Sequence, residues 1–307
     1  MSENLYKLWT TQFLTNLEMK LQQEGSTLRG RVREGFHVGK QASPVQQVGA
    51  IAMRSVVGRF APMARVDADF TRRWVFPVDS ELPQLIDSFD ELKTIVDPKS
   101  TYAENAANAV GRAWDDAIIA AATATSYTGN GADATAFTTE SFDTTNHRVA
   151  DTFGSSAASG LTVAKLIECR RIMRKYHVKF ETDPLTLVIG SQQESDLLNQ
   201  VEFVSTEFND RPVLVDGRVK RFLGFDIVVM ERLPIYTTTT RGVLAFVKSG
   251  LYLGVWKDMS STVDIRPDLA GRPWQLYTSM SIGATRIEPG RVIQIACKDS
   301  TGGDITN

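Results

Sequence analysis

The sequence predicts an α+β fold in which helices come early in the chain and strands come late. A long alanine-rich helix pattern covers residues 102–127, and two shorter helix patterns follow at 162–176 and 191–199. From residue 212 onward, the apolar segments have the length and spacing of β-strands. The 307 residues suffice for one large domain or for two smaller ones.

The start of the chain predicts little globular structure. An amphipathic pattern predicts a helix over residues 5–23, which is too short to bury a core of its own. Residues 25–77 are rich in glycine and proline, and their apolar residues come in short alternating groups. This segment is predicted to be an extended arm followed by a long two-stranded excursion that ends in a strand at 72–78. A two-stranded ribbon is marginal in water, so it is expected to lie on another surface.

Two neighbouring segments carry opposite charge. Residues 20–75 contain ten Lys and Arg against four acids, a net charge of +6, whereas residues 76–104 contain seven acids against two lysines, a net charge of -5. In a chain whose total formal charge is only -2, such blocks indicate electrostatic pairing within the chain or between identical copies. Ordinary solvation of both blocks is an equal alternative.

The 102–127 helix is the longest uninterrupted helix pattern because alanine recurs and proline is absent. Thr101 and Glu104 have the spacing of a capping box at its start, and the Gly-Asn-Gly sequence at 129–131 ends it. A stripe of small and apolar residues predicts that strands pack closely against this helix. The stripe consists of Ala106, Val110, Ala113, Trp114, Ala117, Ile118 and Ala121.

Behind this helix, residues 128–160 are predicted to be a loop with a short hairpin near Phe137. Thr162 is expected to cap the second helix, and Ser191 with Glu194 to form a capping box for the third. The Glu-Pro-Gly-Arg sequence at 288–291 predicts a turn that joins the last two strands as a hairpin. The predicted strands are 185–189, 213–215, 225–230, 243–247, 251–256, 262–265, 276–284 and 291–297.

The sequence supports no catalytic site. Asp115 and Asp116 are adjacent, so on a helix they point about 100° apart; an ion pair with Arg112 is favoured over an acid–base pair. The three histidines lack metal-ligand spacing, and no nucleophile elbow or phosphate loop is present. No catalytic, cofactor-binding or metal-ligating residue is therefore predicted. The cations of residues 170–179 favour a solvated or subunit-facing helix surface over phosphate binding.

Cellular location is only partly constrained by the sequence. The first residues lack a basic segment followed by an apolar one, and no apolar run is long enough to span a bilayer, so neither a signal peptide nor membrane contact is expected. Cys169 and Cys297 are expected to be reduced and buried. The formal charge of -2 argues against a surface built entirely for nucleic acid.

Three stretches resemble one known family. They are QQEGSTLRGRVREGFHVGK at 22–40, the block from RRWVFPVDSELPQL to GRAWDDAIIAAA at 72–122, and SMSIGATRIEPGRVIQIACKD at 279–299. The middle block is the most specific, and together they resemble the major capsid proteins of tailed bacteriophages, which have the Hong Kong 97-like fold, in particular the short-tailed phage branch. Residues 123–160 match least well.

The resemblance implies a fold with five parts. These are an N-terminal arm at 1–39, an extended E-loop at 40–78, a peripheral domain with a spine helix at 79–130, an axial domain with its preceding variable loop at 131–259, and return strands to the peripheral domain at 260–307. It also implies a structural, non-enzymatic protein of the virion capsid that assembles in the host cytoplasm into hexamers and pentamers around double-stranded DNA.

The same resemblance implies partners. The protein is expected to bind copies of itself, a separate scaffolding protein, a portal, a possible cement protein and, nonspecifically, the packaged DNA. An encapsulin-type compartment shell is an alternative with the same fold, and a β-rich hydrolase or binding module is an alternative of another class.

The charge blocks suggest which residues meet a neighbouring subunit. The basic arm and E-loop are expected to reach the acidic segment of the next copy, so reversal of Arg72 and Arg73 to glutamate should impair assembly and leave the subunit folded. The predicted subunit-contact residues are Arg33, Arg54, Arg59, Arg72, Arg73, Asp87, Asp90, Glu91, Arg112 and Asp116.

Overall fold

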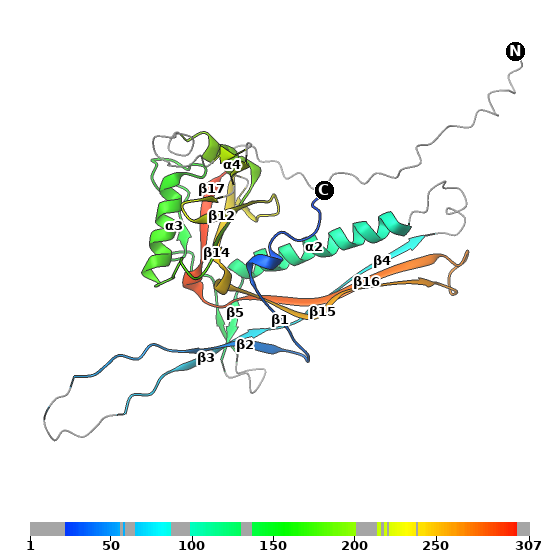
Figure 1. The fold of residues 1–307 in the computed structure, drawn as a ribbon, viewed down its shortest axis with the longest axis horizontal. Helices are drawn as coiled ribbons and strands as arrows, with labels where there is room; N and C mark the ends of the chain where they lie inside the picture. The colour runs from blue at the N-terminus through cyan, green and yellow to red at the C-terminus, as the bar shows by residue number, and fades with distance from the viewer. Residues whose placement is uncertain are drawn as a thin grey trace, which may run out of the picture. The chain divides into compact units, whose positions relative to one another are not determined.

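The computed structural model describes residues 22–55, 58, 65–86, 99–129, 137–200, 214–215, 218–219, 221–237 and 239–299 (Figure 1). The chain forms two compact units. Unit 1 comprises residues 1–26, 79–112 and 257–280, and unit 2 comprises residues 27–78, 113–256 and 281–307. The helix predicted at 5–23 lies almost entirely outside the described residues.

The core of unit 2 is a seven-stranded mixed sheet. Its central strands β8 and β14 are buried along their whole length, in keeping with the apolar runs at 185–189 and 243–247. Along the sheet the order is β11-β12-β8-β14-β17-β7, and β13 pairs with β14. The strands are β7 (Arg148–Val149), β8 (Leu185–Ile189), β11 (Arg221–Phe222), β12 (Phe225–Val229), β13 (Ile235–Thr237), β14 (Thr240–Val247) and β17 (Val292–Lys298).

Two helices accompany this sheet. Helix α3 (Val163–Lys175) packs against β17 and begins as predicted, since the Thr162 hydroxyl accepts a hydrogen bond from the Lys165 amide. Helix α4 (Ser191–Leu198) is capped one residue earlier than predicted: Gly190 is the N-cap, and its amide donates to the Gln193 side chain at 3.1 Å. The predicted Ser191–Glu194 box is therefore wrong in register. Two further short strands, β9 (Leu214–Val215) and β10 (Arg218–Val219), pair antiparallel.

A second sheet in unit 2 carries a projecting ribbon. Its order is β2-β3-β5-β6, with β2 (Ala42–Val48), β3 (Phe70–Val75), β5 (Ser126–Thr128) and β6 (Thr138–Glu140). The antiparallel pair β2–β3 continues beyond the sheet as the ribbon seen at the lower left of Figure 1. Both the two-stranded excursion and the short hairpin near Phe137 are thereby confirmed.

The long helix α2 spans Lys99–Thr123, so it begins before the predicted Thr101 cap and ends four residues before Tyr127. The helix cannot extend to the predicted end at Tyr127, because residues 126–128 form strand β5. Most of the predicted stripe is buried, but Ala113 and Ala117 are only half-buried, whereas Asp115 is fully buried.

A third sheet has the order β1-β15-β16-β4, with β1 (Arg33–Phe36), β4 (Val78–Ile86), β15 (Leu251–Ile265) and β16 (Trp274–Arg286). The strands predicted at 251–256 and 262–265 are one continuous strand, β15. Within unit 1, β15 and β16 are joined by a hydrogen bond between the Ser261 and Thr278 hydroxyls, and the Tyr277 hydroxyl donates to Glu81 of β4 at 2.8 Å.

The last two strands do not form the predicted hairpin. A short 3-10 helix, η4 (Pro289–Arg291), lies between them, and β16 and β17 belong to different sheets. Tertiary contacts decide this redirection: the Ile287 amide donates to the Gly250 carbonyl, and the Arg291 guanidinium donates to the Ser249 hydroxyl at 2.6 Å. The described residues also form the 3-10 helices η2 (Arg29–Arg31) and η3 (Lys248–Gly250).

Several buried polar groups have internal partners. The Lys165 ammonium donates to the carbonyls of Ser159, Gly160 and Ala296 at 2.8, 2.8 and 3.1 Å.

Both cysteines are free and buried, as predicted. Burial raises the pKa of the Cys297 thiol to about 12, so the thiol stays protonated at neutral pH.

Candidate assembly interface

Asp115 attaches the arm, the name used here for residues 22–38, to α2 within unit 2. Its buried carboxylate accepts hydrogen bonds from the Thr27 amide at 3.0 Å, the Thr27 hydroxyl at 3.1 Å and the Leu28 amide at 3.1 Å. Charge-assisted bonds of this kind are about twice as strong as neutral ones. The carboxylate thereby places the fully buried Leu28 in the core of unit 2. The Arg29 guanidinium lies 3.5 Å from the centroid of the Trp114 ring, a cation–π contact.

Within unit 1, the arm residues 22–25 are hydrogen-bonded to the first half of α2. The Gly25 amide donates to the Asn108 side chain at 3.1 Å, and the Arg112 guanidinium donates to the Gln22 side chain at 2.7 Å and to the Gln23 carbonyl at 3.2 Å. Arg112 therefore binds the arm of its own chain. The prediction had paired it with the carboxylates of Asp115 and Asp116.

Gly111 permits this close approach, and its replacement by alanine is expected to displace the arm. A Cβ at position 111 would lie 2.6 Å from the Gly25 Cα, which is too close for two carbon atoms. In an unobstructed helix interior, Gly→Ala stabilises by about 1 kcal/mol; here the clash with backbone should outweigh that gain. We expect proteolysis near residue 25 to accelerate in Gly111→Ala while the helical circular dichroism is kept. Unchanged proteolysis would show that the arm tolerates the methyl group.

The arm ends as β1, which pairs in parallel with β15 over Arg33–Phe36 and Tyr252–Val255. Beyond the strand, the His37 amide donates to the Val255 carbonyl at 2.9 Å, and its ring Nε2 lies 2.6 Å from the Tyr252 hydroxyl. Burial lowers the pKa of His37, so the imidazole is neutral at pH 7. The parallel pairing and this hydrogen bond direct the chain from the arm into β2.

Two arginines organise the base of the ribbon. Arg73 of β3 forms an ion pair with Glu140 of β6, and only 6 % of Arg73 is exposed. Arg286, at the end of β16, is 1 % exposed and donates to the carbonyls of Ala122 and Ala124 at 3.0 and 2.9 Å. These carbonyls lie at the C-terminal end of α2, where no further helical turn can satisfy them. Arg286 also donates to the Glu140 carbonyl at 3.3 Å, so it joins the helix end to β6.

His147 lies beside this cluster and is expected to make the stability of unit 2 fall in mild acid. The ring is 6 % exposed, and its centroid lies 5.0 Å from that of Tyr176. Burial is the main cause that lowers the pKa of His147, with Arg286 acting in the same direction and Asp143 and Glu140 opposing it.

Because folding lowers the pKa of His147, the unfolded chain binds this proton more tightly than the folded chain does. The stability of unit 2 is therefore highest above the unfolded pKa of about 6.5 and declines as the pH falls through that value. In thermal unfolding of the unassembled subunit between pH 7.5 and 5.5, we expect His147→Phe to reduce the decline in melting temperature. An identical decline in both proteins would assign the pH dependence to other groups, such as His37.

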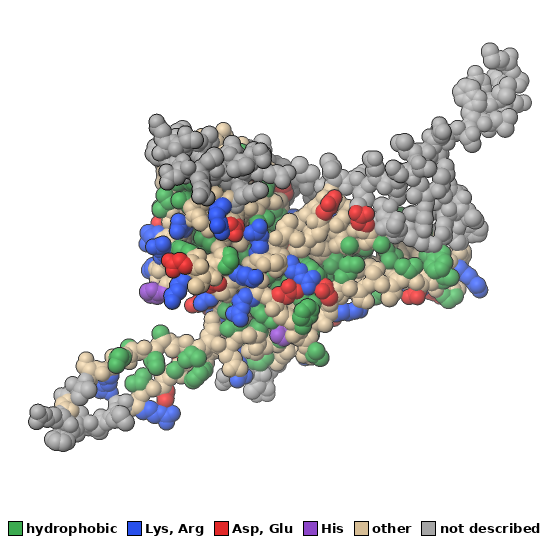
Figure 2. All heavy atoms as spheres, viewed as in Figure 1, with side chains coloured by type: hydrophobic (Ala, Val, Ile, Leu, Met, Phe, Trp, Pro, Cys, Tyr) green, Lys and Arg blue, Asp and Glu red, His purple; other side chains and the backbone are tan. Residues whose placement is uncertain are grey.

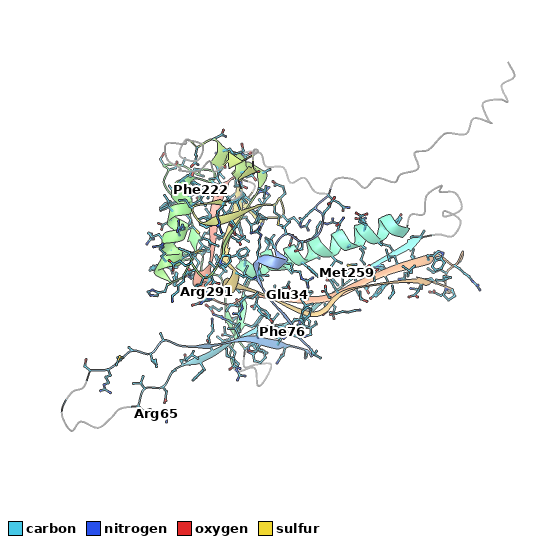
Figure 3. The ribbon with its side chains drawn as sticks, in the orientation of Figure 1. Glu34, Arg65, Phe76, Phe222, Met259 and Arg291 are labelled. Carbon is cyan, nitrogen blue, oxygen red and sulfur yellow. The ribbon has the colours of Figure 1, made fainter. Side chains whose placement is uncertain are left out.

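Apolar side chains line the ribbon beyond its base. Val48, Ile51, Val66 and Phe70 are each more than half exposed, and Met53 is fully exposed. Figure 2 shows hydrophobic side chains along the ribbon together with Lys and Arg, and Figure 3 places Phe76 at the base and Arg65 toward the far end. Exposed apolar residues concentrated on one projection mark a surface that binds another protein.

The described residues contain no group of His, Cys, Asp and Glu that could hold a metal ion, and none of their helices is long and apolar enough to cross a bilayer. The family model described as phage capsid protein matches residues 6–299, nearly the whole chain. The chain belongs to the phage capsid protein family. No curated protein sequence matches this capsid protein.

Solved phage capsids share the fold of this capsid protein at low sequence identity. The capsid of cyanophage Pam1 matches with a TM-score of 0.73 and 11% identity, covering 95% of this chain and 97% of the other. The capsid of cyanophage P-SCSP1u matches with a TM-score of 0.72 and 15% identity, covering 98% and 96%. Mycobacterium phage Che8 matches with a TM-score of 0.67 and 11% identity, covering 94% and 97%. The fold is therefore the α+β Hong Kong 97-like capsid fold.

Family and fold together make the chain a phage major capsid protein, a structural and non-enzymatic component of the virion. The matching structures include both phages and GTA particles, so membership of the short-tailed phage branch is treated below as a proposal. The encapsulin, hydrolase and binding-module alternatives have no comparable support in the family match.

The predicted contact residues of the capsid protein occupy different environments. Arg33, Arg54 and Arg72 are exposed, on β1, in the ribbon and on β3. Asp116 forms an exposed ion pair with Arg232 of the same chain. Arg73 is buried at the ribbon base and paired with Glu140, so we expect its reversal to disturb the fold itself, in contrast to the prediction that the subunit stays folded. Four predicted residues, Arg59, Asp87, Asp90 and Glu91, lie outside the described residues.

Three residues that organise this region were not predicted: Asp115, Arg286 and His147. For Asp115 a signal existed, since on a helix it shares a face with Gly111 and with Ile118 of the predicted apolar stripe, a position that is typically buried. Arg286 and His147 gave no comparable signal, because their partners come from distant segments.

Proposed function

We propose that copies of this capsid protein assemble into the hexamers and pentamers of a closed icosahedral shell around double-stranded DNA. The observation that carries the proposal is the β2–β3 ribbon. Its base is held by Arg73, Trp74 and the second sheet, while its exposed part carries apolar side chains that have no core to enter. A two-stranded ribbon of this kind is marginal by itself and gains stability on a neighbour's surface.

The proposal includes roles for the parts of the chain. Residues 1–39 act as the N-terminal arm, 40–78 as the E-loop, 79–130 as the peripheral domain with α2 as its spine, 131–259 as the axial domain, and 260–307 as return strands. It further includes assignment to the short-tailed branch, assembly in the host cytoplasm, nonspecific contact with packaged DNA, and partners in the form of a separate scaffold, a portal and a possible cement protein.

Negative-stain microscopy of the purified chain at high concentration, with and without a co-expressed scaffold, tests the proposal. Hexamers, pentamers or closed shells are the expected result. A monomer under all of these conditions would contradict the proposal, and closed shells that hold a cargo enzyme in place of DNA would favour an encapsulin-type compartment.

Arg72 offers a narrower test of the proposed pairing between the basic ribbon and the acidic segment of the next copy. Its side chain is exposed on β3, next to the buried Arg73, so Arg72→Glu changes surface charge without removing a buried partner. We expect at least a tenfold loss of assembled particles with an unchanged melting temperature. Arg72→Lys keeps the charge and serves as the control; normal particle yield from Arg72→Glu would refute the pairing.

A further inference from the structure

The outer half of β15 is an open edge of its sheet. Strand β1 pairs with β15 only over Tyr252–Val255, and in the described part of the chain no strand lies beside β15, on the side away from β16, from residue 257 to its end at Ile265. Figure 1 shows β15 and β16 running side by side to the turn that joins them. An open edge presents backbone amides and carbonyls that can pair with another chain.

The hydrogen bonds between β15 and β16 determine which backbone groups face the open side. The Arg266 amide donates to the Pro273 carbonyl at 3.0 Å, and the hydroxyls of Ser261 and Thr278 lie 3.1 Å apart. Both observations give one antiparallel register, in which the even-numbered residues of this part of β15 exchange backbone bonds with β16. The odd-numbered residues therefore point their amides and carbonyls to the open side. These residues, called the β15 edge here, are Met259, Ser261, Val263 and Ile265.

The side chains of the β15 edge are largely apolar. Met259, Val263 and Ile265 are 41, 50 and 48 % exposed, and Figure 3 labels Met259 on this strand. The hydroxyl contact with the buried Thr278 puts them on the inner face of β16. Natural edges that remain single are often protected by Lys or Pro, and residues 258–265 contain neither. The buried layer of the sheet therefore extends to an unprotected margin, which a further strand would cover.

Two copies of the β15 edge complement each other in one antiparallel register. In that register, a two-fold axis passes through Thr262. Met259 of each copy then lies opposite Ile265 of the other. Ser261 lies opposite Val263 in the same way. Each of these facing pairs exchanges two backbone hydrogen bonds, and the apolar side chains cover each other across the two strands.

The charges on the other face of the strand distinguish this register from the neighbouring one. With the axis through Thr262, Asp258 lies opposite Arg266 of the other copy, and opposite charges in facing positions stabilise a sheet. An axis one residue earlier would place Asp258 opposite Asp264, and like charges directly opposite each other are destabilising. The Arg266 guanidinium donates to Asp268 of its own copy at 2.8 and 2.7 Å, so it is ordered before two copies meet.

We propose that the β15 edge pairs with the β15 edge of a copy in a neighbouring hexamer or pentamer, antiparallel and about a two-fold axis through Thr262. The contact rests on the proposed assembly into a closed icosahedral shell, in which a surface on a two-fold axis meets a copy of itself. Two sheets then become one continuous sheet across the axis, and the open edges of both copies disappear. A second copy of this chain is the partner that the matched charges and apolar pairs favour.

A disulfide across the axis tests the pairing in assembled particles of the full-length chain. In the proposed register, Thr262 lies opposite itself in a pair without backbone hydrogen bonds, where the two Cα atoms are about 4.5 Å apart and within reach of a disulfide. After mild oxidation of Thr262→Cys particles, we expect at least half of the subunits to run as covalent dimers on a non-reducing gel. Cys169 and Cys297 are buried and give no background.

Ser260→Cys is the matched control on the same face of the strand. In the paired strands the two copies of this residue lie about 14 Å apart along the strand direction, which no disulfide can bridge. We therefore expect no covalent dimers from Ser260→Cys. In particles that form normally, dimers from this variant, or their absence from Thr262→Cys, would overturn the proposed pairing. If the unaltered chain forms no shells, the proposed function itself fails.

A proline substitution tests whether assembly uses the edge at all. The Val263 amide faces the open side, so Val263→Pro keeps every backbone bond to β16, and the melting temperature of the unassembled subunit should be unchanged. In the shell, the same proline removes a donor from the paired edge, so the particle yield should fall at least tenfold. Val263→Ile keeps the amide and should assemble normally.

Normal yield from Val263→Pro would overturn the proposal. Loss of yield from Val263→Pro without covalent dimers from Thr262→Cys would assign the edge to a strand other than its own copy, and would likewise overturn the two-fold pairing.

Discussion

Replacing Arg286 with methionine should lower the free energy of unfolding of unit 2 by about 3–5 kcal/mol. The guanidinium is buried, lies over the Phe142 ring and donates to the carbonyls of Ala122, Ala124 and Glu140. Methionine fills similar volume but leaves all three carbonyls without this donor, and an unsatisfied buried acceptor costs about 1–3 kcal/mol. The effect is large because one side chain joins the end of α2 to the ribbon base.

Urea denaturation of the unassembled subunit, followed by tryptophan fluorescence, measures this loss, since the Trp74 indole nitrogen donates to the Gly129 carbonyl near the same base. Arg286→Lys retains the charge and can reach fewer of the carbonyls, so its loss should be intermediate. If the free energy of unfolding of Arg286→Met lies within 1 kcal/mol of that of the original protein, water replaces the guanidinium as donor to these carbonyls at little cost in stability.

Replacing Asp115 with alanine should release the arm from α2. Three hydrogen bonds to a buried carboxylate disappear, and the Leu28 amide loses its acceptor, so we expect a loss of about 2–4 kcal/mol. When opening is fast, proteolysis follows the population of the open form, and about 2.8 kcal/mol corresponds to a hundredfold change. Trypsin cleavage after Arg29 and Arg31 should therefore accelerate by about two orders of magnitude.

Asp116→Ala provides a matched control at the adjacent position. Asp116 pairs with Arg232, and because both side chains are substantially exposed, the pair contributes about 0–1 kcal/mol. Its removal should leave cleavage of the arm unchanged. Equal acceleration in the two variants would show that the arm responds to the net charge of α2 and not to the hydrogen bonds of Asp115.

Local patterns predicted the elements whose causes are local. The Thr162 cap, the apolar run of β8 and the alternating strands of the ribbon each depend on neighbouring residues, and the structure confirms them. The prediction that β16 and β17 form a hairpin was wrong because a Pro-Gly turn sets only the local direction of the chain. Hydrogen bonds from Ile287 and Arg291 to residues near position 250 decide which sheet each strand joins.

The candidate interface was predictable in outline only. Charge counting identified the arm and ribbon as the basic region, yet it could not distinguish the exposed Arg72 from the buried Arg73, because that difference depends on Glu140, 67 residues later. In the same way, the sequence singled out the adjacent Asp115 and Asp116 without showing that one binds the arm and the other faces solvent.

During synthesis, the arm is made before the residues of its own chain that it contacts. Leu28 binds Asp115, which follows 87 residues later, and His37 binds Tyr252, which follows 215 residues later. At about 5–20 residues per second, the ribosome delivers these partners roughly 4–17 and 11–43 seconds after the arm itself has been made. The first part of the described chain to be made is thus among the last to be placed, and a newly made arm stays free long enough to meet other chains before it meets its own.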